Sequence, residues 1–215
     1  MSIPTWPVAV FDLDGTVVNT IPLIIASYEH ALTSVLGVRP EPAEAKSWIG
    51  ETLQETFSRR YPERAAELVA SYVAWNAANL ATLAQRYVGM DALLAELVAA
   101  GVQIGLATSK RRLSAENTVK FAGLADRIAV TVAMEDTELH KPSPQPLLLA
   151  LSRLGADPGH SVYIGDAAVD VLAARAAGMD AIAVTWGAGE RSGLAAAGPT
   201  AIVDTMPELR RLLLG

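Results

Sequence analysis

The sequence predicts an α/β fold: a Rossmann-like parallel sheet with helices on both faces and an inserted helical domain. Short apolar runs rich in β-branched residues recur along the chain, and helical patterns that stop at glycines separate most of them. This alternation is typical of parallel sheets whose crossover connections are helices. Residues 21–85 interrupt it, because that stretch contains helical patterns and no clear strand. With 215 residues, 51% of them apolar, the chain is long enough to bury such a core.

Six segments are expected to form the sheet, and helical patterns surround or interrupt it. The expected strands are residues 8–11, 103–108, 127–132, 161–164, 181–184 and 201–203. The expected helices of the sheet domain are residues 90–100, 144–154 and 167–177, and those of the insertion are residues 22–36, 51–60 and 63–83. The alanine-rich residues 195–199 are expected to form a loop. The sheet domain therefore comprises residues 1–17 and 86–215, and the inserted domain comprises residues 18–85.

The composition excludes several classes of function. The net charge of −6 argues against a nucleic-acid or anionic-membrane partner. The absence of cysteine excludes disulfides, thiolate metal sites and a cysteine nucleophile. The first residues lack the basic and apolar regions of a leader, and no 18-residue apolar run occurs. We therefore expect a soluble, cytoplasmic protein.

Two carboxylates follow the first expected strand. Asp12 and Asp14 lie one residue apart, directly after residues 8–11, and Gly15 follows them. Open α/β sheets bind their ligands at the carboxyl ends of the strands. These side chains would form an acidic mouth suited to a hard cation and to an attacking oxygen. For this motif alone, a strand followed by a simple Asx-turn is the structural alternative.

Three later segments carry polar groups at comparable positions. Thr108 ends the second expected strand, and the backbone N–H groups that follow, from Ser109 onward, would cradle an anion. Lys141 lies in a proline-rich turn that restricts its backbone. Asp166 ends the fourth strand, and Asp170 follows one helical turn later. A serine helix cap, a solvated lysine and an aspartate at a helix N-terminus are the structural alternatives, but the combination at successive strand ends favours phosphoryl transfer.

In order and spacing, these motifs resemble the four motifs of the haloacid dehalogenase superfamily. The matching residues are Asp12-x-Asp14-Gly15-Thr16, Thr108, Lys141 and Gly165-Asp166-x-x-x-Asp170. The resemblance covers essentially the whole chain, and the inserted domain resembles a type-1 cap. It implies a phosphatase, because the dehalogenase branch lacks the second aspartate of the first motif, which is Asp14 here.

The resemblance also implies a role for each catalytic residue. Asp12 would be the nucleophile that becomes an aspartyl phosphate. Asp14 would be the general acid toward the leaving oxygen and then the general base toward water. Thr108 and Ser109 would hold the transferring phosphoryl group, and Lys141 would neutralise both that group and Asp12.

The cofactor that the resemblance implies is Mg²⁺. Asp12, the backbone carbonyl of Asp14 and Asp166 would bind it. An all-oxygen donor set suits Mg²⁺, and neither cysteine nor a histidine cluster is present to favour zinc. The supporting residues would be Gly15, Thr16 and Asp170.

Within the superfamily, residues 48–50 and the segment around Trp186 look like the phosphoglycolate phosphatase group and its pyrophosphatase-type relatives. A small phosphorylated metabolite is the expected partner, with 2-phosphoglycolate as the first candidate. Trp48, Ile49 and Gly50 are the expected substrate contacts of the cap. Asn19 departs from this group, which usually has aspartate at that position, so cap contacts near it stay open.

Alternatives to this substrate remain. An inorganic pyrophosphatase, or a sugar-phosphate phosphatase or mutase of the same superfamily, would use the same motifs. A non-catalytic phospho-binding regulatory domain would also place carboxylates at strand ends, but it would not carry a long helical insertion. A dinucleotide site is disfavoured, because no G-x-G-x-x-G follows the first strand. We also expect the insertion to close over the site by bending near residues 17–21 and 85–89.

Overall fold

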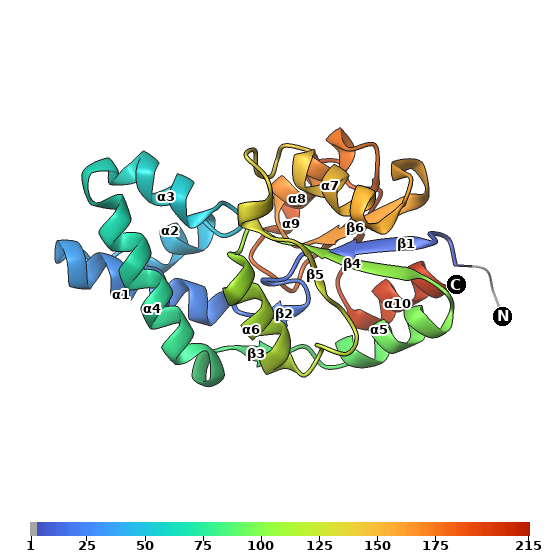
Figure 1. Ribbon diagram of the computed structural model, residues 1–215, viewed down its shortest axis with the longest axis horizontal. Helices are drawn as coiled ribbons and strands as arrows, with labels where there is room; N and C mark the ends of the chain where they lie inside the picture. The colour runs from blue at the N-terminus through green and yellow to red at the C-terminus, as the bar shows by residue number, and fades with distance from the viewer. Residues whose placement is uncertain (1–3) are drawn as a thin grey trace.

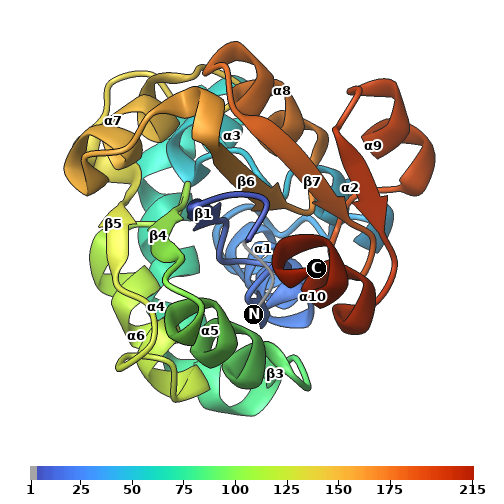
Figure 2. The same ribbon diagram turned by 90° about the vertical axis from the view of Figure 1, so that its right-hand side faces the viewer.

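The centre of the protein is a sheet of six parallel strands, which the computed structural model places in the order β5-β4-β1-β6-β7-β8. The structure describes residues 4–215, so the first three residues of the predicted sheet domain lie outside the described part. Figure 1 and Figure 2 show helices on both sides of this sheet. The strands are β1 (Val8–Phe11), β4 (Gln103–Ala107), β5 (Val130–Val132), β6 (Ser161–Gly165), β7 (Asp180–Val184) and β8 (Ala201–Val203).

Helices cover both faces of the sheet, as the sequence predicted. They are α5 (Met90–Ala99), α6 (Arg112–Ala122), α7 (Gln145–Leu154), α8 (Ala168–Ala176), α9 (Arg191–Ala196) and α10 (Met206–Leu214). Ala9 and Phe11 of β1 pack with α5, α6 and α10 on one face, whereas Val8 and Val10 pack with α7, α8 and α9 on the other. All four side chains are buried, which explains the uninterrupted apolar run of this strand. Among residues 4–215, no helix is both long enough and apolar enough to cross a membrane.

The insertion forms a separate helical unit with its own apolar core. Its helices are α1 (Ile21–Leu36), α2 (Pro42–Ser47), α3 (Leu53–Arg60) and α4 (Ala65–Leu83). Tyr28 lies at the centre of this core, with ring centroids 5.1 Å from Trp48, 5.6 Å from Phe57 and 4.9 Å from Tyr72. A short antiparallel pair, β2 (Val18–Asn19) with β3 (Gln85–Arg86), joins the two ends of the insertion. Figure 1 shows this unit beside the sheet, next to the loops that follow β1 and β4.

Several local predictions differ from the structure. Helices α6 and α10 and the short β2–β3 pair were not among the expected elements. Helix α2 was not predicted, because its six residues are too short for a clear periodicity. Strand β5 begins at Val130 rather than at residue 127, since the amides of Arg127 and Ile128 donate to the carbonyl of Leu124 in a turn after α6. Helix α9 includes two alanines of the expected 195–199 loop, where Leu194 is buried and fixes the helix against the sheet.

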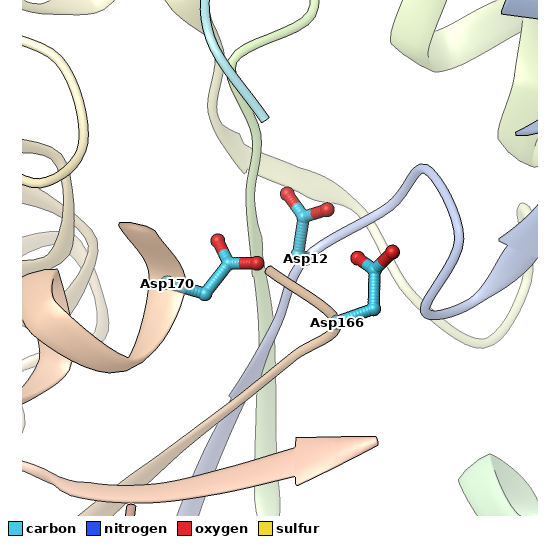
Figure 3. A group of neighbouring side chains, drawn as sticks. All are labelled: Asp12, Asp166 and Asp170. Atoms are coloured by element: carbon cyan, nitrogen blue, oxygen red, sulfur yellow. The ribbon is translucent and has the colours of Figure 1, made fainter. Parts of the chain in front are cut away.

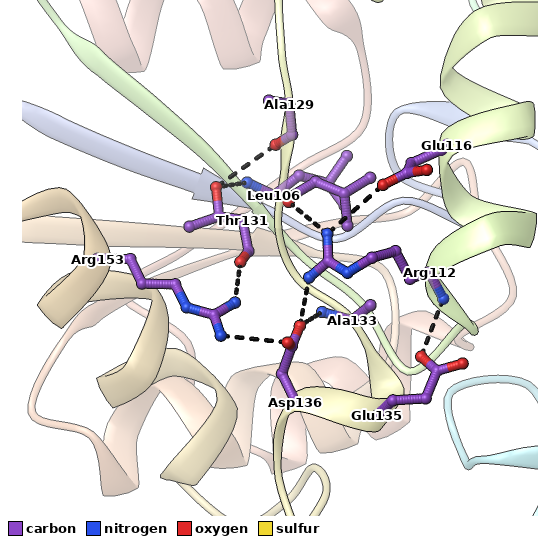
Figure 4. A network of polar contacts seen from close by, with 10 residues as sticks. Leu106, Arg112, Glu116, Ala129, Thr131, Ala133, Glu135, Asp136 and Arg153 are labelled. Carbon is purple, nitrogen blue, oxygen red and sulfur yellow. Dashed lines mark hydrogen bonds and ion pairs between the residues drawn. The ribbon is translucent and has the colours of Figure 1, made fainter.

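A polar network fixes the loop that leads from β5 toward Lys141 (Figure 4). Asp136 ends the short helix that follows β5, and its carboxylate accepts hydrogen bonds from Arg112, Arg153 and the amide of Ala133. Partial burial alone would raise the pKa of Asp136, but the hydrogen bonds from Arg153, the Ala133 amide and Arg112 lower it from 3.8 to about 2. One carboxylate thus ties α6 and α7 to the same loop.

We expect Asp136→Asn to reduce the free energy of unfolding at neutral pH by about 1 kcal/mol, since ion pairs close to solvent contribute no more than this. The depressed pKa of Asp136 stabilises the fold above about pH 4, and this contribution is lost as the pH falls toward 2. Urea titrations between pH 2 and 7 should therefore show the difference between the two proteins shrinking in acid. Glu116→Gln is the matched control, because Glu116 is an exposed partner of Arg112. A difference that stays constant with pH would contradict this account.

Candidate active site

The candidate site lies at the carboxyl ends of three neighbouring strands. Strand β1 lies between β4 and β6, and all three run in the same direction. Asp12, Thr108 and Asp166 each follow the last residue of one of these strands. The sheet order alone therefore brings together groups that are far apart in the sequence, as the motif positions predicted.

Three buried carboxylates lie close together at this edge. Oxygen atoms of Asp12, Asp166 and Asp170 lie within 4.8 Å of one another (Figure 3). Figure 3 shows the carboxylate of Asp170, on α8, directed toward Asp12. Like charges in a buried site repel strongly, so the cluster needs compensating positive charge.

Lys141 supplies one positive charge to this cluster. Its ammonium donates to Asp12 Oδ1 at 2.8 Å, to Asp170 Oδ1 at 2.6 Å and to the hydroxyl of Tyr163 at 3.0 Å. An ammonium has three N–H donors, so these three contacts use all of them. Burial alone would lower the pKa of Lys141, but the charges of Asp12 and Asp170 raise it well above its usual value. Lys141 is therefore a fixed, buried cation and not a solvated surface lysine.

One lysine does not balance the cluster. Burial raises the pKa of Asp12 from 3.8 to about 7, although Lys141 lowers it; Asp170 and Asp14 raise it further. Burial, Asp170 and Asp12 likewise raise the pKa of Asp166 well above its usual value. The site thus has more negative charge than its own residues neutralise. Hard oxygen ligands and an excess of negative charge fit a divalent cation such as Mg²⁺.

Asp166 is held from two loops. Its carboxylate accepts from the hydroxyl of Thr16 at 3.1 Å and from the amide of Ala188 at 2.6 Å. Two glycines make room for it: a Cβ on Gly15 would lie 2.3 Å from Asp166 Oδ2, and one on Gly187 would lie 2.1 Å from the same atom. Gly15 also has a φ of +81°, which favours glycine. These contacts give Gly15 and Thr16 the supporting positions that the resemblance implied.

Asp14 lines the same pocket as Asp12 but has different partners. Its Oδ1 accepts from the hydroxyl of Thr20 at 2.6 Å and from the ammonium of Lys110 at 2.8 Å. Thr20 directly precedes α1, and Lys110 lies in the loop after β4. Asp14 thus contacts both the root of the insertion and the sheet domain.

The loop after β4 contacts the insertion. Helix α6 begins at Arg112, so Ser109 does not cap it; instead the Ser109 hydroxyl donates to the carbonyl of Gly50 at 3.0 Å. The hydroxyl of Thr108 accepts from the amide of Lys110 at 3.2 Å, which turns this loop toward the pocket. The expected anion cradle and the expected cap segment are therefore in direct contact.

The structure corrects one of the three expected cap contacts. Ile49 and Gly50 line the pocket together with Asp12 and Asp14, but Trp48 does not. The side chain of Trp48 is 1% exposed and packs in the core of the insertion, with the Arg60 guanidinium 4.7 Å from its ring centroid. An aromatic side chain of this size gains more from burial among Tyr28 and Phe57 than from a pocket wall.

The sequence did not indicate the contacts of several supporting residues. Tyr163 donates to the carbonyl of Ala107 and accepts from Lys141. In the sequence, however, nothing distinguishes it from the other residues of a buried strand. The hydroxyl of Tyr87 lies 3.1 Å from the Gly15 carbonyl and 3.2 Å from that of Trp186. Trp186, in turn, donates to the carbonyl of Thr16 and so supports the turn after β1; it does not line the pocket. Such long-range contacts have no local periodicity.

Comparison with known proteins agrees with this geometry. The family model described as haloacid dehalogenase-like hydrolase matches residues 9–184. The chain belongs to this family. The match includes every motif residue from Asp12 to Asp170, and the chain is therefore an enzyme, a haloacid dehalogenase-like phosphatase.

Relatives of this haloacid dehalogenase-like phosphatase carry different substrate names. Pyrophosphatase PpaX of Bacillus velezensis is 35% identical over 199 residues, which is 93% of this chain and 92% of that protein. A predicted phosphatase from Clostridium acetobutylicum has a TM-score of 0.86 at 25% identity and covers 96% of this chain and 97% of its own. A predicted phosphoglycolate phosphatase from Haemophilus somnus shares the fold, with a TM-score of 0.86 at 20% identity over 98% of this chain and 99% of its own.

We expect Gly187→Ala to weaken the apparent affinity for the activating cation by about 10–100-fold, the usual effect of disturbing groups that orient a metal ligand. The added methyl group would push Asp166 out of the position that Thr16 and Ala188 define. Phosphate release measured as a function of cation concentration tests this. Gly193→Ala is the matched control, because a Cβ there meets open space. An unchanged cation dependence for Gly187→Ala would show that Asp166 does not bind the cation.

Proposed function

We propose that this enzyme is a Mg²⁺-dependent phosphatase that hydrolyses a small phosphate monoester through an aspartyl phosphate on Asp12. One observation carries the proposal: the carboxylate of Asp12 lines a pocket between the sheet and the insertion and is held at Oδ1 by the buried ammonium of Lys141. Because Oδ1 is engaged, Oδ2 is the oxygen that attacks phosphorus. Lys141 opposes the repulsion between this carboxylate and an anionic phosphate.

The remaining steps need a proton donor and a proton acceptor. Asp14 lines the pocket beside Asp12, so it protonates the leaving oxygen and then takes a proton from the water that attacks the aspartyl phosphate. The backbone N–H groups after Thr108 hold the transferring phosphoryl oxygens. Lys110 donates to Asp14 and so holds this carboxylate in place for both proton transfers.

For the cation, we propose Asp12, the backbone carbonyl of Asp14 and Asp166 as ligands. When bound, Mg²⁺ supplies charge neutralisation for the phosphoryl oxygens. Asp170 lies within reach of the same point; its Oδ1 accepts from the ammonium of Lys141 and its Oδ2 from the amide of Ala167. We propose that Asp170 supports the site by orienting Lys141 and the start of α8, and that it is not one of the three direct ligands.

We also propose that the insertion, residues 18–85, acts as a cap over residues 1–17 and 86–215. The Ser109–Gly50 hydrogen bond beside the pocket and the Lys46–Glu190 ion pair, 3.5 Å long, join the two parts. A closed cap would protect an aspartyl phosphate from uncontrolled water and would contact the leaving group. The β2–β3 pair, which includes Asn19, marks where such a cap bends.

Two substrates have support from similarity alone. The resemblance of the segment around residues 48–50 supports 2-phosphoglycolate, and the pyrophosphatase of Bacillus velezensis supports inorganic pyrophosphate as the second candidate. Sugar phosphates are further candidates within the same chemistry. Each of these substrates would transfer a phosphoryl group to Asp12. They differ in the leaving group, which would contact the cap side of the pocket.

We expect Asp12→Asn to reduce turnover of any phosphate monoester below a few per cent of the original rate, because an amide oxygen is a poor nucleophile and lacks the charge. Asp14→Asn should lower kcat by about 10²–10⁴-fold through the loss of proton transfer. Phosphate release and thermal unfolding of each variant are the measurements. Asp126→Asn, at an exposed aspartate away from the candidate site, is the control. Asp12→Asn that turns over normally would exclude Asp12 as the nucleophile.

We expect removal of divalent cations by a chelator to abolish activity and added Mg²⁺ to restore it. The same addition should raise the thermal unfolding temperature, because a cation neutralises the buried cluster of Asp12, Asp166 and Asp170. Zn²⁺ should restore less activity, since the donor set contains only oxygen. Better rescue by Zn²⁺, or full activity in the chelator, would refute the assigned cation.

A further inference from the structure

The wall that the cap contributes to the pocket is mainly apolar. The pocket floor consists of the candidate catalytic residues, and helices α1, α3 and α4 form the opposite wall. Its apolar and aromatic residues are Ile24, Tyr28, Leu53, Val69, Tyr72 and Val73. The neutral amides of Gln54 and Asn76 also line the pocket, and they donate to Ser58 and Ser27 of the cap. When the phosphate of a substrate faces Asp12, the leaving group still attached to it would lie against these side chains, because they line the same pocket. The wall therefore determines which leaving groups are favoured.

Within residues 4–215, the cap places no lysine or arginine on this wall. Its one charged wall residue is Glu51, whose carboxylate accepts from Arg59 and from the hydroxyl of Thr56. Arg59 is thereby committed to Glu51, and Arg60 lies over the ring of Trp48. The cap thus offers no positive charge to an anionic leaving group.

The two phenols of the wall are neutral. Burial raises the pKa of Tyr28 and of Tyr72 well above 10, so neither ionises near neutral pH. Their rings also form part of the cap's aromatic core, which keeps them in place. They add flat apolar surface to the wall rather than charge.

The cations on the sheet side of the pocket already have partners. Lys141 is bound to Asp12 and Asp170, and Lys110 is bound to Asp14. Arg111 also lines the pocket, but half of its side chain is exposed and it lies 3.8 Å from Glu135. A second anionic group on the substrate would therefore lose its hydration at the cap wall without gaining a counter-charge, which is costly.

We propose that the preferred substrate is a phosphate monoester whose leaving group is uncharged and partly apolar. This inference rests on the proposed phosphatase function and names its substrate class. The carboxylate of 2-phosphoglycolate and the second phosphate of pyrophosphate are both disfavoured at this wall. Alkyl or aryl surface on the leaving group is favoured, because it is buried against Leu53, Val69 and Val73.

The experiment compares kcat/KM for alkyl phosphates with Mg²⁺ present, because discrimination between substrates appears in that ratio. Ethyl phosphate and 2-phosphoglycolate form a matched pair of two-carbon esters that differ by the carboxylate. We expect ethyl phosphate to be favoured over 2-phosphoglycolate, and kcat/KM to rise about fourfold per added methylene from ethyl to butyl phosphate. Butyl phosphate should also exceed inorganic pyrophosphate.

A charged variant tests the wall directly. Val73→Lys places an ammonium on the wall, so it should shift the ratio of kcat/KM for 2-phosphoglycolate over ethyl phosphate upward by about tenfold. Ala74→Lys, at the next position on α4 and exposed, adds the same charge outside the pocket and should leave the ratio unchanged. If Val73→Lys does not fold, the alkyl series on the unaltered enzyme still decides the question.

Two kinds of failure are distinguishable. Hydrolysis of 2-phosphoglycolate or pyrophosphate faster than butyl phosphate, or no gain along the alkyl series, would overturn the apolar substrate class and leave the phosphatase intact. An equal shift for Val73→Lys and Ala74→Lys would also overturn it. Absence of phosphate release from every ester in the set would instead contradict the proposed phosphatase function.

Discussion

The site depends on one buried ammonium group. Lys141 makes hydrogen bonds to Asp12, Asp170 and Tyr163, which lie on three different elements of the sheet domain. Without this cation, three carboxylates would share a buried space with no positive charge from the protein. The same contacts therefore serve two purposes. They offset the repulsion among the buried carboxylates, and they hold the Asp12 carboxylate in its position at the pocket. They also leave a residual negative charge, which is the physical reason to propose a divalent cation there.

The parallel sheet explains why these groups meet at all. Three adjacent strands end at the same edge, so short loops after β1, β4 and β6 place their first polar residues side by side. The insertion then supplies what the sheet lacks, which is an apolar wall across the pocket. Charge is concentrated on the floor and is almost absent from the wall. In the proposed mechanism, the floor carries phosphoryl transfer and the wall selects the leaving group.

Sequence patterns predicted the features that depend on local or periodic arrangements of residues. Strand-end motifs gave Asp12, Thr108 and Asp166, because apolar runs and glycine stops define where strands end. The patterns failed where the contact is long-range: nothing near Lys110 indicates its bond to Asp14, ninety-six residues away. Trp48 was expected at the substrate because the segment resembles a cap motif, yet its size favours the cap core. Similarity to a family therefore located the cap segment, and packing decided which of its side chains reach the pocket.

The most direct test of this account is to trap the covalent intermediate. The enzyme is quenched during turnover with Mg²⁺ and a monoester substrate, reduced with borohydride and analysed by peptide mass spectrometry. An aspartyl phosphate at Asp12 would be reduced to homoserine at that residue alone, and substrate must be present for it to form. This is the result that the geometry of Lys141 and Asp12 predicts. Reduction at another aspartate, or steady turnover with no trapped intermediate, would contradict the assignment of Asp12 as the nucleophile.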